Sequence, residues 1–122
     1  MSCEHCAHCR LREFQKLDWE RTADSVVDQI CAIYRVTHEE IRGNTQVRRV
    51  TWPRQIAYYL IRKMTCASFP KIAGYFHKKE HTSVLTGVAK VSEYLTSHPE
   101  TARTVAKLSL RVTKREEKRL AA

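Results

Sequence analysis

The chain contains one run of polar side chains that could hydrogen-bond to nucleic acid: Lys79, Glu80, His81, Thr82 and Ser83. A carboxylate such as that of Glu80 can accept from the amino group of cytosine, and the methyl group of Thr82 can contact a thymine methyl. The apolar pattern begins only at Val84, so the run can face solvent while the residues after it are buried. If the run opens a helix, backbone N–H groups there can also bind phosphate.

A second cluster lies near the N-terminus and consists of cysteine and histidine: Cys3, His5, Cys6, His8 and Cys9. These residues supply enough ligands for one tetrahedral zinc ion. The second cysteine pair that usually completes such a site is missing. Two other interpretations remain open: a thiol-rich tail that binds metal only adventitiously, and a metal ion shared between two chains, which would make a homodimer. Cys31 and Cys66 lie within helical patterns, and we expect them to be buried apolar residues.

Charge is distributed unevenly along the chain, which has a formal net charge of +9 over 122 residues. Residues 41–79 contain no Asp or Glu. The basic residues of this segment are Arg42, Arg48, Arg49, Arg54, Arg62, Lys63, Lys71, Lys78 and Lys79. Like charges repel one another, so such a segment favours a polyanionic partner. The alternative is an ordinary solvated basic surface.

The elements that must position these residues are all helical, because apolar residues recur at helical spacing and no run alternates as a strand does. We predict an all-α bundle of about five to six helices. The first runs from Asp18 or Thr22 to Tyr34, and a short one covers Thr37–Arg42, where Thr37 and Glu40 form a capping-box pattern. Gly43–Thr51 is predicted to be a basic loop.

The following helices are predicted from Pro53 to Thr65, from Phe69 to Phe76 after a Ser68 cap, and from Glu80 to Thr96. The last two meet at a tight polar turn, which is the outline of a helix-turn-helix. In that motif the second helix enters the major groove of DNA with its N-terminal residues toward the bases.

The chain therefore divides into a Cys/His-rich segment (1–17), a helix-turn-helix domain (18–97) and a basic C-terminal helix (98–122). That last helix, with Val105, Leu108 and Val112 as its apolar stripe, either packs on the domain and adds phosphate contacts or protrudes and pairs with another chain. No apolar run is long enough to span a bilayer, and none resembles a signal peptide. We expect a cytoplasmic, nucleoid-associated protein with no membrane partner.

Three blocks of the sequence resemble the C-terminal DNA-binding domain, domain IV, of bacterial DnaA replication initiators. Residues 79–84, Lys-Glu-His-Thr-Ser-Val, are similar to that family's Arg-Asp-His-Thr-Thr-Val motif. Residues 48–57 resemble its basic loop and the Pro-Arg-Gln helix that follows, and residues 68–73 resemble its Ser-hydrophobic-Pro-Glu-Ile-Gly helix. The resemblance extends from about Val26 to Leu95 and implies a fold like that of domain IV and of the Trp repressor.

The resemblance also implies roles for individual residues. Arg48 matches the arginine that this family places in the minor groove, residues 79–83 match its major-groove motif, and Lys90 matches a phosphate-contacting position. Lys79, Glu80 and Ser83 replace the family's Arg, Asp and Thr, and Thr86-Gly87 replaces a His-Ala pair. These differences favour an altered target sequence.

We therefore predict sequence-preferring binding to double-stranded DNA by a transcriptional regulator or an accessory factor at replication sites. The candidate DNA-binding residues are Arg48, Arg49, Arg54, Arg62, Lys71, Lys78, Lys79, Glu80, His81, Thr82, Ser83 and Lys90. The alternative is a protein-interaction module that kept the fold and modulates the full-length initiator. The three glycines are too scattered for a phosphate-binding loop, and no ordered Cys-His-Asp set is present, so we expect no nucleotide cofactor, no ATPase activity and no other enzymatic activity.

Overall fold

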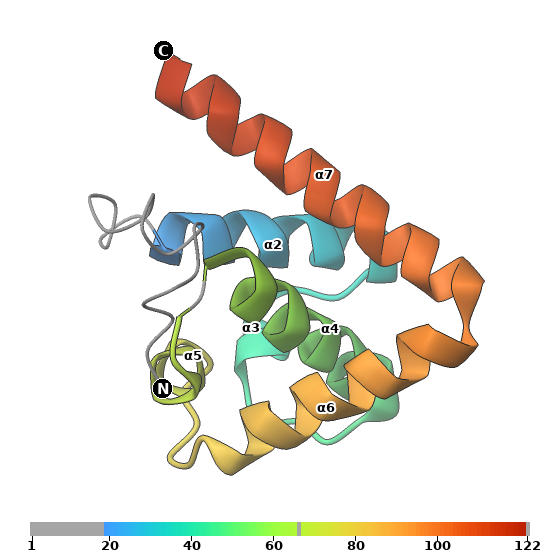
Figure 1. Ribbon diagram of the computed structural model, residues 1–122. Coiled ribbons are helices and arrows are strands. Elements are labelled where there is room, and N and C mark those ends of the chain that lie inside the picture. Colours follow the sequence, from blue (N-terminus) through green and yellow to red (C-terminus); the bar gives the residue numbers. More distant parts are fainter. Residues whose placement is uncertain (1–18, 66, 122) are drawn as a thin grey trace.

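The computed structural model describes residues 19–65 and 67–121, and this part of the chain is all helical, without strands (Figure 1). The helices are α2 (Trp19–Tyr34), α3 (His38–Arg42), α4 (Arg48–Thr65), α5 (Phe69–Tyr75), α6 (Thr82–Ser97) and α7 (Pro99–Ala121). The prediction of an all-α fold with about six helices is confirmed. None of the helices in these two ranges is both long and apolar enough to cross a membrane.

Helix α4 is the centre of the bundle and contacts each of the other five helices (Figure 1). Its apolar residues recur every three or four positions, and Ile56, Leu60 and Ile61 are completely buried. Phe76, at the end of α5, is also fully buried and lies edge-on to Tyr58 of α4 with ring centroids 4.8 Å apart. The other helices are therefore placed by their contacts with α4.

The helix starts that were predicted from capping residues are confirmed. Thr37 and Glu40 form both hydrogen bonds of a capping box at α3. The Ser68 side chain accepts from the backbone N–H of Lys71 and caps α5, with Pro70 in the first turn.

The predicted start of α4 at Pro53 is wrong, because the helix begins five residues earlier, at Arg48. The backbone N–H groups of Val50 and Thr51 both donate to the carbonyl of Val47 at 2.9 Å, which closes a helical turn before the proline. This earlier turn buries Val50, which is 1% exposed. Pro53 has no N–H to donate within the helix, so the turn before it is held by the two bonds to Val47 and by the packing of Val50. Arg48 and Arg49 therefore lie on a helix and not in a loop.

The turn between α5 and α6 has a defined backbone structure. His77 adopts a left-handed conformation with φ 58°, its N–H donates to Gly74, and the next N–H, of Lys78, donates to Ala73. This pair of bonds is a Schellman motif, which ends a helix sharply. Helix α6 then begins at Thr82, two residues later than predicted, and its stripe of Val84 and Val91 is fully buried. The two helices and this turn form the predicted helix-turn-helix.

Helix α7 packs against α2 with its apolar stripe, so the predicted packing on the domain is confirmed, whereas phosphate contacts by this helix stay a prediction. Val105, Leu108 and Val112 are at most 3% exposed. Farther along the helix, Arg115 lies 3.3 Å from Asp28 of α2, and the other oxygen of Asp28 lies 2.5 Å from His38 of α3. Asp28 thus links three helices at the surface.

The two helical glycines of the helix-turn-helix make a testable pair. A Cβ atom at Gly87 would lie 2.9 Å from Cδ2 of Tyr58, whereas one at Gly74 would meet no atom within 4 Å. Alanine favours a helix over glycine by up to about 1 kcal/mol. We expect Gly74→Ala to raise the urea midpoint and Gly87→Ala to lower it, because the ring of Tyr58 is buried and has no room to move. A Gly87→Ala protein as stable as the Gly74→Ala protein would contradict this packing.

Candidate nucleic-acid interface

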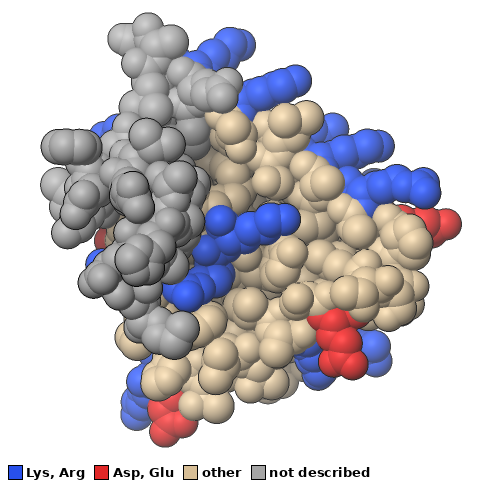
Figure 2. Space-filling view, viewed as in Figure 1, with Lys and Arg blue, Asp and Glu red and all other residues tan. Residues whose placement is uncertain are grey.

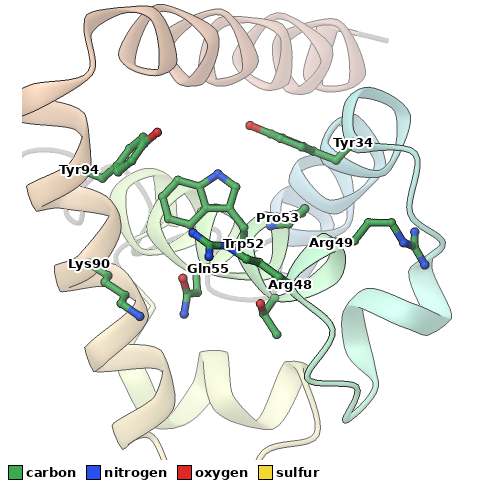
Figure 3. Close-up of a pocket in the computed structure, with 9 residues that line it drawn as sticks. Tyr34, Arg48, Arg49, Trp52, Pro53, Gln55, Lys90 and Tyr94 are labelled. Carbon is green, nitrogen blue, oxygen red and sulfur yellow. The ribbon is translucent and has the colours of Figure 1, made fainter.

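One surface of the protein is hollowed where α4 and α6 cross, and we call it the α4–α6 groove. It consists of two adjoining hollows that share Thr51, Gln55 and Lys90. The first, of about 800 Å³, is lined mainly by Tyr34, Arg48, Trp52 and Tyr94 (Figure 3). The second is lined by residues that include Lys78, Glu80, Thr82, Ser83 and Thr86. The groove thus brings together side chains from both of the sequence blocks that resemble DNA-contacting segments.

The leading edge of α6 faces solvent. His81, Thr82 and Ser83 are exposed, and Val84 directly after them is completely buried. His81 occupies the cap position of the helix, but its side chain makes no capping hydrogen bond. Its imidazole therefore does not cap α6, and it remains accessible to a ligand together with the hydroxyl groups of Thr82 and Ser83.

Arg48 and Arg49 point in different directions. Arg48 extends across the groove in front of Trp52, on the side toward Lys90 (Figure 3). Arg49 turns toward α3, where its Nη2 lies 2.5 Å from a carboxylate oxygen of Glu40. The backbone N–H of Thr37 and then the Arg49 guanidinium lower the pKa of Glu40. Both arginines line the first hollow, but Arg49 is paired with Glu40, whereas Arg48 has no ion pair within the described residues.

The N-terminal turn of α4 has a positive electrostatic potential. Both arginines lie in its first turn, which has no acidic residue. The N-terminus of a helix already carries partial positive charge, so cations there are unfavourable by about 0.3–1 kcal/mol each. An anion beside this turn would relieve that repulsion.

Arg54 is buried, and its guanidinium is engaged within the protein, so a DNA contact by Arg54 stays a prediction. The residue is 4% exposed, and its three guanidinium nitrogens donate to the carbonyls of Ile41 at 2.7 Å, Thr45 at 2.9 Å and Glu40 at 3.0 Å. Burial lowers the pKa of Arg54, but a guanidinium stays protonated in proteins. Arg54 therefore ties α3 and the 43–47 loop, which leads into Arg48, to helix α4, and it also lines the second hollow.

Lys78 holds the same loop from the other side. Its ammonium donates to the carbonyl of Gly43 at 3.1 Å and to the side-chain oxygen of Asn44 at 3.3 Å. Burial and, to a smaller extent, the charge of Arg54 lower the pKa of Lys78. Since Lys78 belongs to the turn before α6, these bonds connect the helix-turn-helix to the loop before Arg48.

Four predicted contact residues are not among those that line the groove: Arg62, Lys71, Lys79 and His81. Arg62 donates to the carbonyl of Ala67 at 2.8 Å and lies over the ring of Phe69, where it supports the connection between α4 and α5. Lys71 lines a different hollow, together with Trp19 and Asp24. A DNA contact by Arg62 or Lys71 stays a prediction.

Sequence reasoning missed Thr51, Gln55 and Thr86, which all line the groove. It also missed Leu85 of α6, which is 46% exposed. The signal was helical periodicity. Thr86 follows Thr82 by one turn and precedes Lys90 by one turn, so the three share a face of α6. Gln55 follows Arg48 by two turns, but this relation required a helix that starts before Pro53.

The predicted zinc ligands Cys3, His5, Cys6, His8 and Cys9 lie outside the described residues, as does Cys66. Within residues 19–65 and 67–121, no three potential ligands gather into a metal site. Cys31 is half-buried, and burial, followed by the charges of Asp28 and Glu40, raises the pKa of its thiol to about 11. A thiol in this state is a poor metal ligand, because metals bind the thiolate.

Comparison with known proteins agrees with this geometry. A family model described as the bacterial DnaA protein helix-turn-helix matches residues 23–91. The chromosomal replication initiator protein DnaA of Deinococcus radiodurans is 40% identical over 92 residues, which are 75% of this chain and 20% of that protein. The DnaA proteins of a Nostoc species and of Limosilactobacillus reuteri are 32% and 33% identical over 76% and 72% of the chain. The chain spans about a fifth of the length of these relatives.

The role of Arg54 can be tested by its removal. Arg54→Ala leaves three carbonyl groups without their charged donor, and hydrogen bonds to charged groups contribute about 1.5–3 kcal/mol each, so we expect a loss of at least ~3 kcal/mol in the free energy of unfolding. Arg49→Ala is the control, because it breaks only an exposed ion pair that is worth less than ~1 kcal/mol. Urea denaturation measures both. Equal stability of the two variants would show that the buried guanidinium does not hold the loop.

Proposed function

The chain belongs to the bacterial DnaA helix-turn-helix family, and from this premise we propose that it binds double-stranded DNA with a preference for sequence. In this proposal the N-terminus of α6 enters the major groove, and Arg48 reaches the adjacent minor groove. The observation that carries it is the shared groove: Arg48, on α4, and the leading edge of α6 open onto one surface although 34 positions separate Arg48 from Thr82.

The exposed side chains of the groove, of α6 and of the turn before it divide into two chemical roles. Lys79 and Lys90 are exposed cations, which suit phosphate oxygens and contribute affinity without reading sequence. His81, Thr82 and Ser83 combine donors and acceptors, which can read base edges in the major groove. Leu85 adds an exposed apolar contact on the same helix, of the kind that suits a thymine methyl.

The target sequence is expected to differ from that of the family. The carboxylate of Glu80 stands one methylene farther from the backbone than an aspartate would, and Ser83 lacks the methyl group of a threonine. Each good base contact is worth about 1–3 kcal/mol of discrimination, so changes at these positions are large enough to alter the preferred bases.

We propose that the biological role is that of a transcriptional regulator or of an accessory factor at replication sites, without ATPase activity. The 122 residues contain no phosphate-binding loop, and the described part matches only the helix-turn-helix of the initiators. The proposed activity needs no cofactor, because hydrogen bonds and charge supply both affinity and selectivity.

Selectivity can be measured on a duplex selected from a random library, with a scrambled duplex for comparison. His81→Ala and Arg48→Ala should each reduce the ratio of the two affinities by about 5- to 150-fold, since each removes a base contact worth about 1–3 kcal/mol. Lys90→Ala is the matched control on the same groove, and it should weaken both duplexes equally because a phosphate contact is blind to sequence.

The same measurements distinguish DNA binding from the alternative function, a protein-interaction module that kept the fold. A protein-interaction module would show no duplex binding at moderate salt in the parent protein. If selection returned no preferred sequence, the proposed selectivity would be refuted. If Lys90→Ala changed the sequence preference, Lys90 would contact bases and not phosphate, and the proposed orientation of the groove on DNA would be wrong.

A further inference from the structure

Helix α7 carries a row of cations that the proposed contacts do not use. The row lies beyond the family match, which ends at residue 91. Its members, which we call the α7 stripe, are all exposed: Arg103, Lys107, Arg111, Lys114 and Lys118. They follow one another at spacings of 4, 4, 3 and 4 residues, so they share one face of the helix. Lys and Arg side chains project along the edge of the molecule where α7 lies (Figure 2).

This arrangement is unfavourable for the isolated protein. Like charges three or four positions apart on a helix repel each other, and the stripe contains four such pairs in succession. Among the described residues, the one cation of α7 with a recorded ion pair is Arg115, which lies outside the stripe and contacts Asp28. The helix dipole favours cations in the last turn of α7, but Arg103 and Lys107 are in its first half and do not gain from it.

The opposite side of α7 is occupied. Val105, Leu108 and Val112 are buried within the bundle, so the helix has no free apolar face to insert into a bilayer. Leu110, which is 55% exposed, is the one large apolar residue that α7 presents among its described side chains. The anchors of protein interfaces are mostly Trp, Tyr and Arg in well-packed, desolvated pockets, and residues 99–121 contain no aromatic residue around which such a contact could form. The chemistry of the stripe fits a regular polyanion better than a membrane or a protein.

We propose that the α7 stripe is a second DNA-binding surface, which holds phosphates of duplex DNA outside the segment in the α4–α6 groove. The stripe spans roughly 22 Å at the helical rise of 1.5 Å per residue. Each strand of duplex DNA carries a charge about every 3.4 Å along the helix axis, so roughly six phosphates of one strand span the length of the stripe and its five cations. The surface reads no bases and adds affinity for any sequence. This inference rests on the proposed binding to duplex DNA.

The test is the salt dependence of binding to a selected and to a scrambled 40-base-pair duplex. In the double variant Lys107→Gln/Arg111→Gln, the slope of log affinity against log salt should become shallower by about 1.8, because each lost phosphate contact removes about 0.9. Affinity at moderate salt should fall about tenfold or more for both duplexes, with their ratio unchanged. The thermal midpoint should not fall, since the substitutions relieve repulsion between exposed side chains.

The matched control is Arg21→Gln/Lys63→Gln, which removes two exposed cations from α2 and α4 and the same net charge. Equal slopes in the two double variants would mean that only net charge matters, and an unchanged slope in the α7 variant would mean that the stripe does not touch DNA. Either result overturns the inference and leaves the groove intact. Loss of binding to phosphatidylserine vesicles with unchanged duplex binding would overturn it in favour of a lipid partner. A parent protein that binds neither duplex would instead refute the proposed function itself.

Discussion

The structure depends on one buried guanidinium. Arg54, from the second turn of α4, binds the carbonyls of Glu40, Ile41 and Thr45 and so closes the chain between α3 and α4 onto the central helix. Lys78 binds the same loop from the turn before α6. The loop therefore couples the arginine end of α4 to the leading edge of α6, and two surfaces from distant parts of the sequence keep a fixed relation. Without these bonds, packing between α4 and α6 would still hold the two helices together, but the first turn of α4 would lose its connection to the turn before α6.

Cations that bind backbone carbonyl groups explain why the distribution of charge alone did not identify the residues that face the groove. Arg42, Arg54, Arg62 and Lys78 all belong to the acid-free segment, and each donates to backbone oxygen within the protein. A cation without a nearby acidic residue in the sequence suggests an external anion, but a backbone carbonyl is an equally good acceptor and leaves no trace in the sequence pattern. Several cations of the basic segment thus stabilise the fold through hydrogen bonds to backbone carbonyl groups, and only some of its charge faces the groove.

Most of the helices were predictable, because apolar spacing and capping residues are local signals. Thr37 and Ser68 marked the starts of α3 and α5 correctly, and the stripe of Val84 and Val91 oriented α6. The start of α4 was not predictable in this way, since Pro53 is a typical first residue of a helix and the turn before it is held by the bonds to Val47 and the packing of Val50. The same error hid Gln55 from the candidate site. The leading edge of α6 was found from its run of polar residues, whereas the distinction between Arg48 and Arg49 required the position of Glu40.

The contact between Gly87 and Tyr58 explains one departure from the family pattern, in which alanine stands at the position of Gly87. The ring of Tyr58 fills the space that a methyl group would need, so α6 and α4 approach each other at the expense of that side chain. The sizes of the residues at 87 and 58 are consequently coupled: a larger residue at 87 requires a smaller side chain at 58 and a shift of Gln55, whose Cγ would lie 3.1 Å from the new Cβ atom. In relatives that keep this close approach, the sizes of these two residues should vary inversely.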